Sequence, residues 1–219
     1  MNDVQAVIFD LDGTLVDSMW IWEEIDNIYL KSKGYSVPPN IGDEITHLSF
    51  QQTAQYFKDK FNITDSVEII MATWNTMAFD LYNKKVKLKE GALEFLTHLK
   101  SNGIKIGLAT SNSITLLEAT LKSNNVYDLF DSITVTDEVK KSKENPDIYL
   151  LAAKKLNVDP KSCMVFEDII PAVRGAKKAG MRVTAVYDLH NKKDAEVLKE
   201  LADNFIVNYH ELLLQPIES

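Results

Sequence analysis

The chain has 219 residues, of which 45% are hydrophobic and 26% charged, and it carries a formal net charge of −8 with a pI of about 5.1. This composition is ordinary for a globular protein and excludes the disordered, collagen-like and repeat classes. The acidic balance argues against nucleic acid or a membrane surface as a partner, so any anionic ligand must be held locally.

The first predicted element is a strand over "VQAVIFD" (4–10), and it leads into "DLDGT". Residues 17–85 then show helical periodicity without a convincing strand, and Asp17 with Ser18 is expected to cap the first helix. All three tryptophans lie in this stretch, which predicts an inserted helical unit with its own core. The predicted helices cover residues 18–33, 49–61 and 66–84.

From residue 86 onward, short apolar runs alternate with helical stretches. Continuous apolar strands separated by helices indicate a parallel sheet covered on both faces. We therefore expect an α/β, Rossmann-like core built from residues 1–16 and 86–219, with residues 17–85 as an inserted all-helical domain. The later predicted strands are residues 104–109, 132–135, 163–166, 182–186 and 204–207.

The single cysteine, Cys163, lies in the apolar run "CMVF" and cannot form an internal disulfide, which is typical of a core residue in a reducing compartment. No apolar run approaches the roughly 18 residues of a membrane span, and strand-like sequence begins at Val4 without a signal peptide. These features predict a cytoplasmic protein, which we expect to be a monomer or a weak homo-oligomer.

Asp10 and Asp12 are the first candidates for chemistry. Residues two apart on a strand point to the same side, so both carboxylates can converge beyond the strand's carboxyl end, where open α/β sheets bind ligands. Because like charges repel, such a pair favours a nearby cation or a shared proton. A calcium loop is excluded because the EF-hand's glycine and final glutamate are missing, whereas simple turn capping remains as an alternative.

Three further stretches add polar groups at predicted strand or helix ends. "LATSN" presents Thr110, Ser111 and Asn112 before a helix, where an anion can bind, although these residue types also cap helices routinely. "KKSKENPD" offers lysines before a helix, and "MVFEDI" ends a strand with Glu167 and Asp168. Together these groups suggest Mg²⁺ holding a phosphate.

These motifs resemble the haloacid dehalogenase superfamily of phosphohydrolases, in the branch with a helical cap after the first motif that includes β-phosphoglucomutase-like proteins. "DLDGT" matches the first motif, Thr110 the second, Lys143 in "KENPD" the third, and the acids at 167 and 168 the fourth. The four motifs occur in the family's order and span nearly the whole chain.

The resemblance implies a role for each matched residue. Asp10 would be the nucleophile that forms an aspartyl-phosphate, and Asp12 the general acid and base. Thr110 would hydrogen-bond the phosphoryl group, and Lys143 would neutralise charge. The implied phosphate-binding residues are Gly13, Thr110, Ser111, Asn112 and Lys143, and the implied Mg²⁺ ligands are Asp10, Asp12 and Asp168, with Glu167 in or near the shell.

The sequence departs from this pattern at several positions. Ile169 and Ala172 replace a common serine and glycine after the fourth motif, and Glu144 replaces a proline in the third. In the insert, Trp22 stands where the related sugar mutases carry a histidine, and "HLSF" (47–50) replaces an arginine-containing motif. The missing histidine and arginine favour hydrolysis over a mutase reaction, because a mutase must grip both ends of a bisphosphate.

The leading prediction is therefore a Mg²⁺-dependent phosphatase that acts on a small phosphorylated metabolite. A β-phosphoglucomutase-like phosphosugar mutase is the main alternative. A receiver-like signalling module is disfavoured because Asp12 would promote dephosphorylation and such a module has no use for the insert. Dehalogenation is also disfavoured, because those family members lack the second aspartate and the metal.

Overall fold

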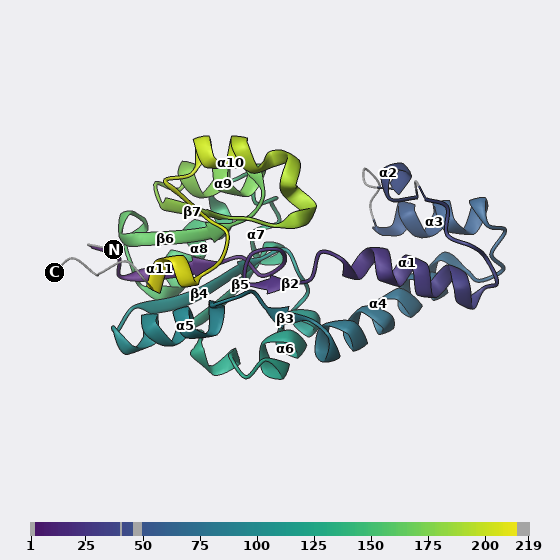
Figure 1. Cartoon of the computed structure of the whole chain (residues 1–219), viewed down its shortest axis with the longest axis horizontal. Helices are drawn as coiled ribbons and strands as arrows, with labels where there is room; N and C mark the ends of the chain where they lie inside the picture. Colours follow the sequence, from purple (N-terminus) through teal and green to yellow (C-terminus); the bar gives the residue numbers. More distant parts are fainter. Residues whose placement is uncertain (1–2, 40, 46–49, 214–219) are drawn as a thin grey trace. The chain divides into compact units, whose positions relative to one another are not determined.

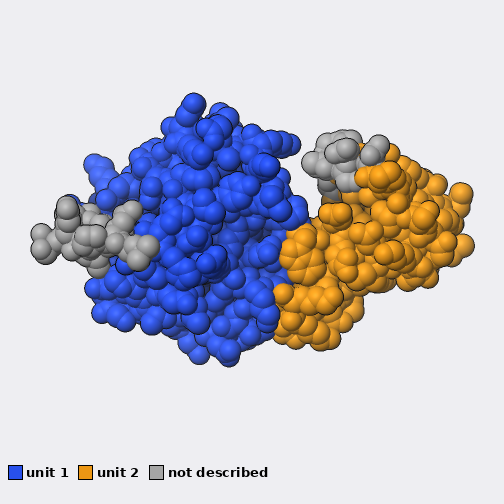
Figure 2. Space-filling view, in the orientation of Figure 1, with its two compact units in different colours: residues 1–19, 86–219 blue, residues 20–85 orange. Residues whose placement is uncertain are grey.

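The computed structural model describes residues 3–39, 41–45 and 50–213. It divides into two compact units (Figures 1 and 2): Met1–Met19 with Val86–Ser219, and Trp20–Lys85. The insert was predicted to begin at residue 17, but residues 17–19 belong to the larger unit. Among the described residues, no helix is both long enough and apolar enough to cross a membrane.

The larger unit contains a six-stranded sheet with the order β5-β4-β1-β6-β7-β8, and every pairing in it is parallel. The strands are continuous apolar runs because helices cover both faces of the sheet, so neither face favours polar side chains. The predicted fold class is thus confirmed. The strands are β1 (Ala6–Phe9), β4 (Lys105–Thr110), β5 (Ser132–Val135), β6 (Cys163–Glu167), β7 (Arg182–Val186) and β8 (Asn204–Ile206).

Alternate residues of β1 pack into different layers. Ala6 and Ile8 belong to the core cluster under α8, α9 and α10, which also buries Cys163. On the other face, Phe9 stacks on Phe166 with ring centroids 5.0 Å apart, and Phe95 of α5 packs edge-on against both. Figure 1 shows α5 and α9 on opposite sides of the sheet.

The helices of the larger unit are α5 (Ala92–Ser101), α6 (Ile114–Ser123), α7 (Thr136–Val139), α8 (Asp147–Leu156), α9 (Ile170–Lys178), α10 (Ala195–Leu201) and α11 (His210–Leu213), with short 3₁₀ turns η1 (Tyr127–Leu129), η2 (Pro160–Ser162) and η3 (Leu189–Asp194).

The strand order reverses at β1. The chain passes from β1 to β4 and β5 on one side, and then returns to β6, β7 and β8 on the other. Ligands of open α/β sheets bind at such a switch point, beyond the carboxyl ends of the strands. Asp10 immediately follows β1 and therefore occupies this position.

The described residues of the smaller unit form helices and no strand, as predicted, and the unit has an aromatic core. The ring of Trp74 lies 5.1 Å from that of Phe57 and 5.7 Å from those of Tyr29 and Phe50. Burial of such large rings against one another supplies the packing energy of a small helical unit. Its helices are α1 (Ile21–Ser32), α2 (Ile41–Ile45), α3 (Phe50–Lys60) and α4 (Val67–Lys84).

Two details near the insert differ from the predictions. Short strands β2 (Val16–Asp17) and β3 (Lys87–Leu88) pair across the insert's ends, and two residues are too few to show strand periodicity. The proposed capping by Asp17 and Ser18 is wrong, because α1 begins at Ile21 without a side-chain cap. His47 and most of the "HLSF" stretch lie outside the described residues.

Asp26 in α1 makes the stability of the chain depend on pH. Burial, with a smaller effect of Glu23, raises the pKa of Asp26 from 3.8 to about 7. The folded state therefore keeps a proton that the unfolded chain releases, and stability falls as pH rises from about 4 to about 7. We expect Asp26→Asn to match wild type near pH 4 and to be more stable near pH 8, by on the order of 2–4 kcal/mol.

Urea unfolding followed by tryptophan fluorescence tests this expectation, because all three tryptophans lie in residues 20–85. The difference between variant and wild type should grow steadily with pH. A difference that stays constant from acid to alkaline pH would show that burial of this carboxyl does not control the dependence.

Candidate active site

The four motifs meet at one edge of the sheet. Asp10 follows β1, Thr110 is the last residue of β4, and Glu167 ends β6 directly before Asp168. The carboxyl ends of neighbouring parallel strands lie at the same edge, which explains how residues more than 150 positions apart become neighbours. Asp10, Thr110, Glu167 and Asp168 are all buried.

Lys143 joins this edge from the loop between α7 and α8. Its Nζ donates to Oδ1 of Asp10 at 2.6 Å and also pairs with Glu167, and its side chain is only 7% exposed. Burial opposes the ammonium charge, but the carboxylates of Asp10 and Glu167 outweigh it and raise the pKa of Lys143 above its usual range. The lysine is therefore a fixed positive charge beside Asp10.

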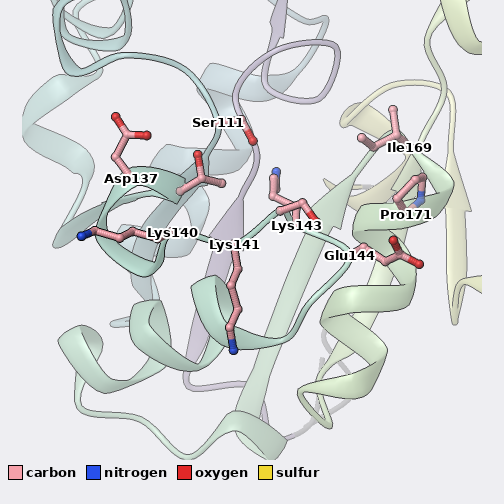
Figure 3. Close-up of a pocket in the computed structure, with 10 residues that line it drawn as sticks. Ser111, Asp137, Lys140, Lys141, Lys143, Glu144, Ile169 and Pro171 are labelled. Carbon is pink, nitrogen blue, oxygen red and sulfur yellow. The ribbon is translucent and has the colours of Figure 1, made fainter. Parts of the chain in front are cut away.

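An open pocket of about 560 Å³ adjoins Lys143 (Figure 3). In this view the Lys143 amine points toward Ser111, whereas that of Lys141 points away. Lys141 instead pairs with Asp147 at 2.6 Å on the surface. The structure thus separates the buried lysine of "KKSKENPD" from an exposed neighbour that the sequence alone could not set apart.

Three carboxylates converge beside the lysine. One oxygen each from Asp10, Glu167 and Asp168 lies within 4.8 Å of the others. Burial, followed by the charge of Asp10, raises the pKa of Asp168 to about 7; burial also raises that of Glu167 to about 8 despite the opposing charge of Lys143. One lysine offsets one of the three negative charges, so a divalent cation would complete the balance.

Two further observations fit a cation at this cluster. Oε2 of Glu167 is buried and has no hydrogen-bond partner among the described residues, although Oε1 accepts from Tyr149 at 2.8 Å. Gly13 has a positive φ of +78°, and a Cβ there would overlap Oδ2 of Asp168. Glycine is therefore required for this close approach. The site consists of hard oxygen donors of the kind that bind Mg²⁺.

Asp12 is held at the edge of the same site by two donors. The Ser18 hydroxyl donates to its Oδ1 at 2.6 Å, and the Asn112 side chain donates to its Oδ2 at 2.8 Å. The backbone N–H of Asn112 donates to Oγ1 of Thr110 at 3.0 Å, so the loop before α6 is braced internally. The bonds from Ser18 and Asn112 fix the orientation of the Asp12 carboxylate.

Several contacts to the acids involve residues that the sequence did not single out as functional. The Thr14 hydroxyl donates to Oδ1 of Asp168 at 3.0 Å, and the Asn191 side chain donates to its Oδ2 at 2.7 Å. Ser18 belongs to this group, since its hydroxyl contacts Asp12 and caps no helix. Thr14 follows the acid pair directly in "DLDGT", and Asn191 lies beyond the carboxyl end of β7. In the sequence, these positions gave only a weak indication that the two residues contribute to the site.

Comparisons with known proteins identify the family of the chain. The family model of haloacid dehalogenase-like hydrolases matches residues 7–186. The chain is 30% identical over 211 residues to a phosphorylated carbohydrates phosphatase of Thermotoga maritima, covering 96% of this chain and 97% of that protein. It is 31% identical over 185 residues to the bifunctional riboflavin kinase/FMN phosphatase of Arabidopsis thaliana, covering 84% of this chain but only 48% of that protein.

A solved structure from Thermotoga maritima, named provisionally as a β-phosphoglucomutase, superposes with a TM-score of 0.87. It is 29% identical in sequence and covers 96% of this chain, which covers 98% of it. The fold, the order of the four motifs and the family match are mutually consistent. The chain therefore belongs to the haloacid dehalogenase-like hydrolases, in the branch that carries a helical insert after the first motif.

Proposed function

We propose that this protein is a Mg²⁺-dependent phosphatase that hydrolyses a small phosphorylated metabolite through an aspartyl-phosphate on Asp10. The observation that carries the proposal is the surroundings of Asp10, which lies at the switch point of the sheet with Lys143 at 2.6 Å and two further buried acids beside it. A carboxylate is a weak nucleophile, and a phosphate already bears negative charge, so this reaction needs positive charge at the site.

In the first step, an oxygen of Asp10 attacks phosphorus in line with the leaving group. The bond between phosphorus and the substrate oxygen breaks as Asp12 donates a proton to that oxygen. Lys143 neutralises charge on Asp10 and on the phosphoryl group. Thr110, Ser111, Asn112 and the Gly13 backbone would line the phosphoryl pocket.

In the second step, Asp12 takes a proton from a water molecule, whose oxygen attacks the same phosphorus atom. The bond to Asp10 then breaks and inorganic phosphate leaves. Asp12 returns to its protonated form, so one side chain serves both halves of the reaction. The bonds that Asp12 accepts from Ser18 and Asn112 support this role by fixing the orientation of its carboxyl group.

Asp10, Asp168 and the backbone carbonyl of Asp12 would hold Mg²⁺, with Glu167 bound directly or through water. When bound, the ion would supply positive charge that offsets the carboxylates and the phosphoryl oxygens. Burial is the largest cause of the raised pKa values of Glu167 and Asp168, about 8 and about 7, and the negative charge of Asp10 raises both further.

A substrate panel tests the proposal. Phosphate release is measured from sugar, polyol, nucleotide and aryl phosphates, with Mg²⁺ and after removal of metal by EDTA. We expect release with Mg²⁺, loss of it with EDTA, and recovery when Mg²⁺ is returned. The likeness to a phosphorylated carbohydrates phosphatase makes sugar phosphates the first class to test. Equal release with and without metal would contradict the role of Mg²⁺.

The likeness to the provisional β-phosphoglucomutase supports a mutase as the second candidate. At the position of the mutase histidine, Trp22 packs edge-on against Phe50 with ring centroids 5.6 Å apart, and an indole cannot act as a general base there. Incubating a hexose 1-phosphate with a trace of its 1,6-bisphosphate separates the two reactions. Hexose 6-phosphate would accumulate with a mutase, and free phosphate with a phosphatase.

Gly175 in α9 is expected to support the position of Lys143. A Cβ at residue 175 would overlap the backbone carbonyl oxygen of Lys143. Alanine usually stabilises a helix interior relative to glycine by about 1 kcal/mol, but overpacking costs about 1–3 kcal/mol. We therefore expect Gly175→Ala to destabilise the protein and to lower kcat by about 10- to 100-fold, because Lys143 moves away from Asp10.

Gly180→Ala is the matched control, measured by urea unfolding and by phosphate release. Residue 180 has φ +78°, so the substitution is strained, but its Cβ would meet no described atom within 4 Å. This control should lose stability and keep its kcat. Equal kcat values for the two variants would show that the contact with Lys143 has no part in positioning the amine.

A further inference from the structure

Both carboxylate oxygens of Asp168 are engaged by neutral donors. Thr14 donates to Oδ1 at 3.0 Å, and Asn191 donates to Oδ2 at 2.7 Å. Asp168 is 2% exposed, so these bonds fix the rotation of a carboxylate that water hardly reaches. Thr14 belongs to the first motif, whereas Asn191 lies in η3, outside all four motifs that define the site.

The backbone of η3 is shaped to present Asn191. Asp188 caps this 3₁₀ turn by accepting from the backbone N–H of His190 at 2.9 Å. The turn is interrupted at Asn191 itself, where φ is −101° and ψ is 17°. This break in the turn coincides with the residue whose amide reaches Asp168.

A buried ion pair anchors the start of η3. Nζ of Lys89 lies 2.8 Å from Oδ2 of Asp188 and donates to the carbonyl oxygen of Tyr187 at 2.8 Å. The side chains of Lys89 and Asp188 are 12% and 4% exposed, so solvent screens the pair little. Lys89 directly follows β3 and is 99 residues away from Asp188 in sequence.

The chemistry of an amide suits a residue that orients a metal ligand. A neutral N–H donor fixes the carboxylate and leaves its negative charge available to a cation, whereas a lysine would compete with that cation. Outer hydrogen-bond partners of this kind typically change metal affinity by about 10- to 100-fold when they are removed.

We propose that Asn191 is a positioning residue that orients Asp168 toward the divalent cation, and that the ion pair between Lys89 and Asp188 holds Asn191 in place. The inference rests on the proposed function in one respect, namely that Asp168 is a metal ligand. It adds a fifth segment, η3, to the four motifs of the site.

The direct test is binding of Mn²⁺ to the whole protein without substrate, followed by electron paramagnetic resonance, with Mg²⁺ as competitor. Asn191→Ala and the nearly isosteric Asn191→Leu should both weaken Mn²⁺ binding by about 10- to 100-fold. Lys193→Ala, an exposed change in the same turn, should bind as wild type does. Binding by Asn191→Ala within twofold of wild type would overturn the proposal.

A second readout separates positioning from a purely structural role. At saturating Mg²⁺, kcat of Asn191→Ala should recover most of the wild-type value, while the Mg²⁺ concentration for half-maximal rate rises by the factor seen with Mn²⁺. A variant that loses thermal stability but keeps its metal affinity would contradict the inference. If wild type binds Mn²⁺ yet releases phosphate from no ester, the proposed function fails and the positioning role still stands.

The anchoring role of Lys89 is tested by a double-mutant cycle. Lys89→Met should weaken Mn²⁺ binding by a smaller factor than Asn191→Ala. The double variant should bind no more weakly than Asn191→Ala, because residues that act through one another are not additive. Asp188→Asn keeps the oxygen that caps η3 and serves as a second variant if Lys89→Met does not fold. Effects that multiply would place Lys89 outside this chain of contacts.

Discussion

Asp10→Asn should lower kcat/KM for phosphate release by about 10⁴-fold or more, because an amide cannot form the covalent intermediate. The same change should not destabilise the protein. Lys143 still pairs with Glu167 when Asp10 is replaced, and removing the negative charge of Asp10 reduces its repulsion with the neighbouring Glu167 and Asp168.

The measurement combines initial rates on the best ester of the panel with a thermal melt of the metal-free protein. Asp128→Asn, an exposed carboxylate-to-amide change, is the matched control and should keep wild-type activity. Activity of Asp10→Asn within tenfold of wild type, with the fold intact, would show that Asp10 is not the nucleophile.

Asp12→Asn should produce the second largest effect, a loss of about 10²- to 10⁴-fold in turnover. The loss should depend on the leaving group. A nitrophenolate leaves without a proton, so formation of the aspartyl-phosphate from an aryl phosphate should be nearly normal, whereas its hydrolysis still requires a base for water. The bonds from Ser18 and Asn112 can be made to the asparagine oxygen, so the loop should keep its shape.

Stopped-flow release of nitrophenol makes this expectation sharp. Asp12→Asn should show a burst close to one equivalent of enzyme, followed by slow turnover. With a sugar phosphate, whose alkoxide needs protonation, rapid-quench measurement of the released sugar should show no burst. A uniform loss for both esters, without a burst, would mean that Asp12 does not act separately in the two steps.

The strands were predictable because each is a short, continuous apolar run, and burial on both faces leaves no other arrangement for such a run. The three long helices of the insert were found from their periodicity. β2, β3 and α2 were missed, because elements of two to five residues are too short to carry a period.

The acids of the site were predictable because parallel strands direct their carboxyl ends to one edge, so polar residues there can be identified one strand at a time. The contacts among side chains were not. Ser18 has the residue type of a helix cap, and only the three-dimensional path of the loop turns its hydroxyl toward Asp12. Tyr149 and Asn191 reach the acids from a helix and a turn that no motif marks.

The choice among lysines shows the same limit. Lys140, Lys141 and Lys143 are chemically equivalent in the sequence, and the family resemblance rather than their spacing selected Lys143. In the structure Lys143 is buried against two carboxylates, whereas Lys140 and Lys141 are exposed. Burial of a charged side chain depends on the whole fold, so it cannot be predicted from a local sequence pattern.

Transfer of the phosphoryl group through Asp10 in two successive in-line displacements is tested most directly by the stereochemistry at phosphorus. Wild-type enzyme would hydrolyse a substrate whose transferred thiophosphoryl group is made chiral with oxygen isotopes, in water labelled with the remaining isotope. Each displacement inverts phosphorus, so the inorganic thiophosphate released should show overall retention of configuration. Inversion would mean that water attacks the substrate directly, and would contradict the account.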